Sequence, residues 1–389
     1  MPSSKVTRRG SGWTLRSEGV NPVKASGSEI EEKERRVRRF LGEKGLTALC
    51  FTTSKNFAWF TCGGDNHVEL TNRKGVSTIV VTRDSKYIVT NNIESVRMTA
   101  EEVEGQGFEV METPWHDDKR FDMINELARG GKIGTDFAFS GAEYMDPEIA
   151  PMRYSLTDEE VMRYREVGRL TGAALEESCE EIGPGQTEHE IGSVMAQHLL
   201  AWGVVPAVIL IAVDDRIEKF RHPIPTEKKL EKCAMLVTCG RRWGLIASAT
   251  RLVHFGSLPE ELEKKHQACT LIDAGLIART AEGKPVSELL EKAISDYGST
   301  GYGEQWKFHH QGGATGYQTR EFLATPSSGE KVRRNQAFAW NPSIAGTKSE
   351  DTMISLDDGP VIATATGGWP MLEHEIDGTI IERPDIKRL

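Results

Sequence analysis

The sequence contains three histidines in two short motifs that could move protons. His222 lies between an arginine and a proline in a segment expected to be a loop, and His309 and His310 follow the aromatic run 306–308. An imidazole titrates near neutral pH, so a histidine in a cleft can both take and give a proton. We expect one histidine to shuttle a proton in catalysis, either His222 or one of His309 and His310. If residues 308–317 form a strand, neighbouring side chains point to opposite faces, and only one of the pair can face a cleft.

Charged residues complete the set of candidates. Arg320 offers a planar fork that suits a carboxylate of a substrate, and Glu321 beside it could orient a cationic or amide nitrogen. A structural salt bridge is the alternative for this pair. Glu350 could act as a general base or hold a cationic nitrogen. For Arg251 and Asp351 a bridge between strands is the expected role.

Three motifs in order make the second half of the chain resemble the pita-bread domain of creatinase, aminopeptidase P, prolidase and methionine aminopeptidase. The family pattern D-x-G…G-Y-x-x-D-x-T-R, then G-H-G-I-G-x-x-x-H-E, then E-P-G and E-D-T, corresponds to Thr238–Gly240 with Gly244–Arg251, Gly312–Glu321, Asn341–Ser343 and Glu350–Thr352. The resemblance covers about 157–382. The run Asn56–Thr61 resembles the N-x-x-W/Y-L-T-G strand of the small N-terminal domain in the creatinase and aminopeptidase P branch.

The resemblance also implies a two-metal site that this sequence lacks. The positions of the family's Asp, Asp, His, Glu and Glu ligands read Thr238, Ser248, Gly313, Asn341 and Glu350. One carboxylate cannot offset the charge of two divalent ions about 3.5 Å apart. A register that promotes His310 to the lost histidine restores only one ligand. We therefore expect no metal cofactor, with Thr238, Ser248 and Asn341 hydrogen-bonding a substrate instead.

Periodicity and turn residues divide the chain into two α/β (α+β) domains. The sequence predicts helices at about 29–44, 117–129, 157–182, 187–202, 259–280 and 285–297. It predicts strands at about 47–51, 56–61, 76–82, 86–90, 132–135, 207–213, 234–239, 244–253, 308–317, 336–344, 351–355 and 360–365. Thr157–Glu160 and Thr187–Glu190 are capping boxes that start helices. The expected domains are 29–150, with a small mixed sheet, and 151–389, where two helices followed by strands occur twice. The resemblance to the pita-bread domain implies that the strands of 151–389 form a curved antiparallel sheet.

Charge and hydropathy argue against a nucleic-acid-binding protein and against a membrane-spanning protein. A net charge of −10 argues against nucleic-acid binding, which requires a basic face. No apolar run reaches about 18 residues, so no membrane span is expected. Residues 1–28 are expected to be a flexible arm. The six cysteines form no C-x-x-C pair and indicate free thiols in a reducing cytoplasm.

These observations favour a metal-independent hydrolase or lyase that cleaves a C–N bond of a small amino-acid, amidino or peptide-like substrate. Creatinase, by resemblance, implies that this fold can do so with histidine and glutamates. Two alternatives stay open: a non-catalytic protein that binds a peptide or small ligand, and an Xaa-Pro aminopeptidase with shifted metal ligands. The resemblance also implies a homodimer.

Overall fold

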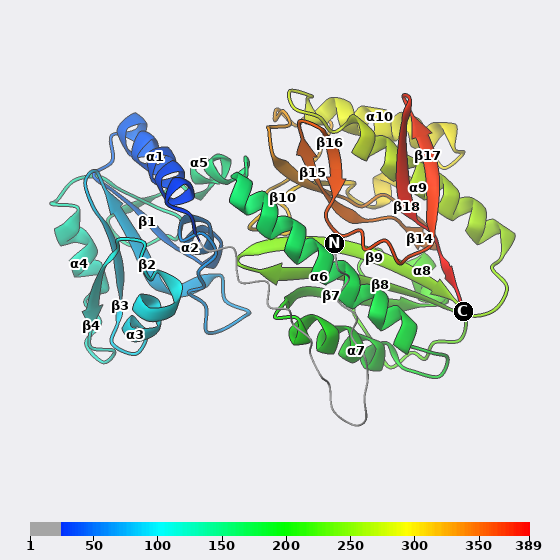
Figure 1. Cartoon of the computed structure of the whole chain (residues 1–389), viewed down its shortest axis with the longest axis horizontal. Helices are drawn as coiled ribbons and strands as arrows, with labels where there is room; N and C mark the ends of the chain where they lie inside the picture. The colour runs from blue at the N-terminus through cyan, green and yellow to red at the C-terminus, as the bar shows by residue number, and fades with distance from the viewer. Residues whose placement is uncertain (1–24) are drawn as a thin grey trace.

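A computed structural model describes residues 25–389. They form two regions that lie side by side in Figure 1, the first ending near helix α5 and the second beginning with the long helix α6. Most of the arm expected over 1–28 falls outside the described residues. Its last residues start a helix: the Ser26 hydroxyl accepts a hydrogen bond from the Glu29 amide, and the helix ends at Gly45, whose φ of 63° is left-handed.

The first region is built on a six-stranded mixed sheet with the order β4-β3-β2-β1-β5-β6. Its strands are β1 (Ala48–Thr53), β2 (Lys74–Thr82), β3 (Lys86–Asn91), β4 (Glu109–Thr113), β5 (Ile133–Thr135) and β6 (Ala142–Tyr144). Its helices are α1 (Gly27–Lys44), α2 (Ser54–Phe60), α3 (Ser95–Arg97), η1 (Met98–Glu102), α4 (Arg120–Leu127), α5 (Asp146–Ile149) and η2 (Ala150–Arg153). Strand β1 pairs antiparallel with β2 and parallel with β5, which confirms the expected mixed sheet.

The strand expected over 56–61 is wrong, because this segment forms helix α2. Every residue from Asn56 to Phe60 is buried, so the run shows no polar face that would reveal a helical period. Tertiary contacts decide the conformation: the Asn56 amide donates to Asp136 at 2.8 Å, and Phe51 packs edge-on against Trp59. Periodicity cannot distinguish a short, fully buried helix from a buried strand.

The second region contains two main sheets, ordered β19-β9-β8-β7 and β11-β10-β12-β15-β16. Its helices are α6 (Asp158–Glu181), α7 (Glu188–Ala201), α8 (Asp215–Lys219), α9 (Glu260–Arg279), α10 (Val286–Ser299) and η3 (Gln305–Phe308). Its strands are β7 (Val205–Val213), β8 (Cys233–Arg242), β9 (Leu245–His254), β10 (Gly312–Thr315), β11 (Phe322–Leu323), β12 (Gln336–Trp340), β13 (Ser343–Ile344), β14 (Thr347–Lys348), β15 (Asp351–Leu356), β16 (Gly359–Ile362), β17 (Met371–Ile376), β18 (Thr379–Pro384) and β19 (Lys387–Arg388).

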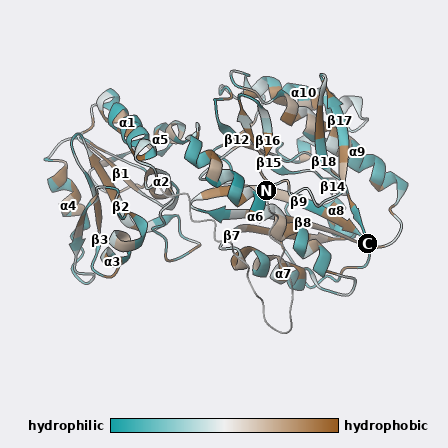
Figure 2. Ribbon diagram, viewed as in Figure 1, coloured by the Kyte–Doolittle hydropathy of each residue, from teal (hydrophilic) through white to brown (hydrophobic). Residues whose placement is uncertain are grey.

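The helix pair α6–α7 and the helix pair α9–α10 each precede strands, which matches the expected duplication. Figure 2 shows apolar residues concentrated on strands that lie between these helices. Both capping boxes form: the side chains of Thr157 and Thr187 accept from the amides of Glu160 and Glu190, and each glutamate accepts in return. These local bonds fix where α6 and α7 begin.

Strands β9 and β15 bring the separate sequence motifs together. The Thr250 amide donates to the Glu350 carbonyl at 3.0 Å, and the Ser248 amide donates to the Thr352 hydroxyl at 2.7 Å. Arg251 pairs with Asp351 at 3.0 Å, which confirms the bridge expected between strands. Residues 248–251 and 350–352, which are about a hundred positions apart in the sequence, are therefore neighbours in the fold.

A buried ion network joins the two regions. Lys33 of α1 lies 2.8 Å from both Glu29 and Glu160, and all three side chains are fully buried. Arg163 of α6 also pairs with Glu29, and the Tyr317 hydroxyl donates to Glu160 at 2.6 Å. Because breaking such a pair leaves a buried charge alone, the network fixes α1 against α6.

The described residues also bear on two other expectations. Among residues 25–389, none of the helices combines the length and the apolar surface needed to cross a bilayer. The six cysteines are all buried and free of disulfide bonds, as expected.

Candidate functional site

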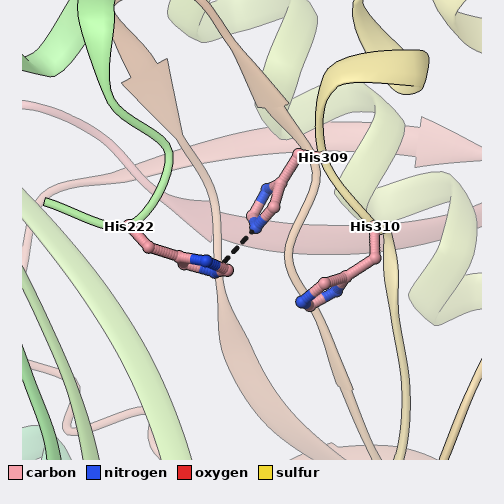
Figure 3. Close-up of side chains that lie close together, drawn as sticks. All are labelled: His222, His309 and His310. Carbon is pink, nitrogen blue, oxygen red and sulfur yellow. Dashed lines mark hydrogen bonds between the residues drawn. The ribbon is translucent and has the colours of Figure 1, made fainter.

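Three histidines from separate segments bring their imidazoles together (Figure 3). His222 comes from the loop between α8 and β8, whereas His309 and His310 follow η3 and precede β10. The Nε2 atoms of His222 and His309 are 3.2 Å apart, and one ring nitrogen of each histidine lies within 4.8 Å of the others. We call these three residues the histidine cluster.

The expectation that only one of His309 and His310 faces the site is wrong. Their ring centroids lie 5.0 and 5.8 Å from that of His222. The strand expected over 308–317 begins only at Gly312, so the alternation of side chains in a strand does not apply to the pair.

The surroundings of the cluster favour the neutral form of its imidazoles. Burial lowers the pKa of all three, and nearby cations add to this effect. For His310, burial followed by the charge of Arg320 lowers the pKa to about 4. Nδ1 of His309 lies 3.1 Å from the Ser343 hydroxyl, which orients the ring. Nδ1 of His310 is buried, and no partner for it occurs in residues 25–389.

Glu350 is held by two cations. The Lys348 ammonium is 2.6 Å from Oε2 and the Arg320 guanidinium is 3.2 Å from Oε1, while the Thr250 hydroxyl donates to Oε2 at 2.8 Å. Burial by itself raises the pKa of the Glu350 carboxyl, but Lys348 and Arg320 outweigh burial and bring the pKa down to about 2. An ionised carboxylate with both oxygens engaged is a poor proton acceptor, so this geometry disfavours the expected general-base role.

Three of the other positions of the implied metal site, Thr238, Ser248 and Gly313, are poorly suited to hold a metal ion. The Thr238 hydroxyl donates to a carbonyl of strand β7 at 3.0 Å, and the Ser248 hydroxyl lies 3.1 Å from Sγ of Cys239. A Cβ atom at Gly313 would lie 2.2 Å from a carbonyl oxygen of strand β11, so no histidine fits there without a backbone shift. These residues do not fit a pair of divalent ions, and Lys348 and Arg320 bring positive charge to Glu350 instead.

Unpartnered polar atoms lie beside the cluster. The Asn341 amide nitrogen is 3.5 Å from Nε2 of His309, whereas the Asn341 Oδ1 atom and the Arg320 Nε atom are buried without partners in the described part of the chain. A buried polar group without a partner costs about 1–3 kcal/mol. An open hollow of about 390 Å³ borders His309 and His310. Neither Asn341 nor Arg320 lines this hollow, so the unsatisfied atoms themselves, next to the histidines, are what indicates a site for a ligand.

Glu321 lies apart from this group. Its carboxylate pairs with Arg153 at 2.6 Å and accepts from the Tyr317 amide at 3.0 Å, and its side chain is 1% exposed. The structure thus matches the alternative of a structural salt bridge for Glu321, while Arg320 faces Glu350. Thr238 and Ser248 lie on β8 and β9, with their hydroxyls directed into the contacts described above.

Sequence reasoning missed Lys348 and Ser343. A signal for Lys348 was present: it stands two residues before Glu350, and residues i and i+2 of an extended segment lie on the same side. No comparable signal marks Ser343, whose contact with His309 depends on how β13 packs against the segment after η3.

Residues 162–365, more than half of the chain, match the model of metallopeptidase family M24. The solved structure of the Xaa-Pro dipeptidase from Bacillus anthracis is similar, with a TM-score of 0.75, 17% identity, and coverage of 92% of this chain and 100% of that chain. The prolidase from Pyrococcus horikoshii OT3 has a TM-score of 0.74 at 18% identity, with coverage of 86% and 98%.

A further similar structure is the N-terminal domain of the FACT complex subunit SPT16 from Cicer arietinum. Its TM-score is 0.65 at 12% identity, with coverage of 87% of this chain and 97% of that chain. At these identities the likeness concerns the fold. No curated protein matches the sequence.

Proposed function

The chain belongs to metallopeptidase family M24 and has the fold of the creatinase, aminopeptidase P and prolidase superfamily, and we propose that it is a metal-independent hydrolase of a C–N bond. The substrate is a small amino-acid-like, amidino or peptide-like molecule. The observation that carries this proposal is that Lys348 and Arg320 hold the one retained ligand, Glu350, beside a cluster of neutral histidines.

The unpartnered atoms support a substrate with an amide or amidino group. Arg320 offers a free N–H donor at Nε, and Asn341 offers a free acceptor at Oδ1. A donor and an acceptor together match the C=O and N–H of an amide, or the carboxylate and N–H of an amino-acid derivative. Lys348 and Arg320 add positive charge where negative charge develops on the substrate oxygen during attack.

The histidine cluster supplies the proton transfers. In the proposed reaction a water gives a proton to an imidazole of the cluster, and its oxygen bonds to the carbon of the scissile C–N bond. The electron pair of the C=O or C=N bond moves to the heteroatom and then returns. The C–N bond breaks, and the leaving nitrogen takes the proton from the imidazolium. One water is consumed, and the histidine ends neutral.

A substrate screen with a chelator tests the proposal. Purified protein is assayed on N-acyl amino acids, Xaa-Pro dipeptides and guanidino or amidino acids, in buffer and in buffer with EDTA. We expect turnover that EDTA leaves unchanged and that His310→Ala lowers by about 10²–10⁴-fold. The matched control is His189→Ala, an exposed histidine of α7. Turnover abolished by EDTA, or unchanged in His310→Ala, would contradict the proposal.

A second candidate function is ligand binding without catalysis. The loss of four of the five implied metal ligands favours it, as does the engagement of both Glu350 carboxylate oxygens by Lys348 and Arg320. Native mass spectrometry of the purified chain distinguishes the two: a retained peptide or small molecule without turnover supports binding. Two tightly held metal ions per chain would instead support an Xaa-Pro aminopeptidase with shifted ligands. The homodimer and the cytoplasmic location expected from the sequence stay predictions.

A further inference from the structure

We propose that His222, His309 and His310 form a site for one divalent transition-metal ion, such as Zn²⁺ or Co²⁺, beside the family's two-metal position, since the Asn341 amide nitrogen lies 3.5 Å from Nε2 of His309. None of the three histidines occupies one of the five implied ligand positions. The inference about binding does not depend on whether the protein is an enzyme.

The distances between the ring nitrogens support this site. Two nitrogens bound to tetrahedral zinc at about 2.0–2.1 Å lie about 3.4 Å apart. The Nε2 atoms of His222 and His309 are already 3.2 Å apart, and a nitrogen of each of the three histidines lies within 4.8 Å of the others. His222 is exposed and His310 is half-buried, so small rotations of these rings can close the remaining gap.

A neighbouring side chain orients one of the three proposed ligands. A metal-bound histidine usually makes a hydrogen bond through its other ring nitrogen, which fixes the orientation of the ring. His309 has this contact, because its Nδ1 lies 3.1 Å from the Ser343 hydroxyl.

The chemistry of the ligands selects the class of ion. Imidazole suits Zn²⁺, Co²⁺, Ni²⁺ and Cu²⁺, whereas Mg²⁺ and Ca²⁺ prefer oxygen ligands. Three protein ligands leave a fourth position for water or an anion. Glu350 offsets only one of the two positive charges on Lys348 and Arg320, so the remaining charge repels a bound metal ion, and an anion in the fourth position would reduce this repulsion.

A consequence for catalysis follows, and it rests on the proposed function. A metal ion that occupies the imidazole lone pairs removes the proton acceptors, so Zn²⁺ inhibits turnover reversibly. This effect is opposite to that in a metallopeptidase, where removal of metal abolishes activity. If Zn²⁺ binds to the histidines but does not inhibit turnover, the result contradicts the proposed function and leaves the metal site intact.

Direct titration tests the site. Full-length protein without a histidine tag is stripped with EDTA, dialysed, and titrated with CoCl₂ by absorption spectroscopy and with ZnCl₂ by calorimetry. We expect one ion per chain, the intense visible bands of tetrahedral Co²⁺, and a dissociation constant far below about 1 mM. We expect Ser343→Ala to weaken binding by about 10–100-fold.

Variants of the histidine cluster distinguish a specific metal site from adventitious metal binding. His222→Ala changes an exposed loop residue and should fold normally, and His309→Gln preserves the volume of a buried side chain. Each should abolish the tetrahedral spectrum, while His189→Ala should bind as the wild type does. Wild type that binds no ion up to about 1 mM, or His222→Ala and His309→Gln with unchanged spectrum and affinity, would overturn the inference.

Discussion

Replacing Lys348 with methionine tests whether a cation stabilises the retained carboxylate. The substitution removes the charge but keeps an unbranched side chain of similar size. It leaves Glu350, whose side chain is 3% exposed, with only Arg320 and the Thr250 hydroxyl as partners. The folded protein must then contain a buried carboxylate that is less well neutralised.

The magnitude follows from the geometry. At an effective dielectric of about 20, unit charges 2.6 and 3.2 Å apart attract by about 6 and about 5 kcal/mol. Most of this attraction offsets the cost of removing the ions from water, and breaking one buried pair costs about 3–5 kcal/mol. Because Arg320 continues to neutralise Glu350, we expect Lys348→Met to lower the free energy of unfolding by about 3 kcal/mol.

The assay is a double-mutant cycle. The wild type, Lys348→Met, Glu350→Gln and the double variant are unfolded in urea at pH 7 and followed by circular dichroism, and variants are compared only where the m values agree. We expect the double variant to be more stable than the sum of the single changes implies, by about 2 kcal/mol. A coupling energy near zero, or a loss below about 0.5 kcal/mol in Lys348→Met, would refute the conclusion that this pair stabilises the site.

Three further outcomes are expected. Burial raises the pKa of Glu29, but Lys33 and Arg163 outweigh burial and lower it from 4.5 to about 2. The stabilisation of the folded protein by the Glu29 carboxylate is therefore present above about pH 4.5 and lost as the pH falls toward 2, by up to about 3 kcal/mol. The free energies of unfolding in urea at pH 7 and pH 3 should differ less in Glu29→Gln than in the wild type. Thr187→Ala removes the helix cap of α7 and should cost about 1 kcal/mol in the same assay, and an unchanged midpoint would show that the cap is dispensable. Gly313→Ala places a Cβ 2.2 Å from a carbonyl oxygen and should cost about 1–3 kcal/mol by thermal unfolding, whereas normal stability would show that the backbone has room for a side chain.

Elements with local signals were predicted well. The capping boxes at Thr157 and Thr187 start α6 and α7 as expected, because both partners of each cap lie within four residues. The strand expected at Asn56 was a helix, because its residues are buried on every side and only long-range packing distinguishes the two conformations. The histidine pair was misjudged for a related reason, since β10 begins later than the sequence suggested.

Residue identity alone determined that the family's five ligand positions retain one carboxylate, because a charge that the sequence lacks cannot be supplied by folding. The tertiary structure decided which side chains surround that carboxylate and which histidines lie near it. Arg320 reaches Glu350 from 30 residues away, and His222 meets His309 from a loop 87 residues away. These contacts depend on how β9, β14 and the segment after η3 pack together, and such long-range packing leaves no periodic or local pattern in the sequence.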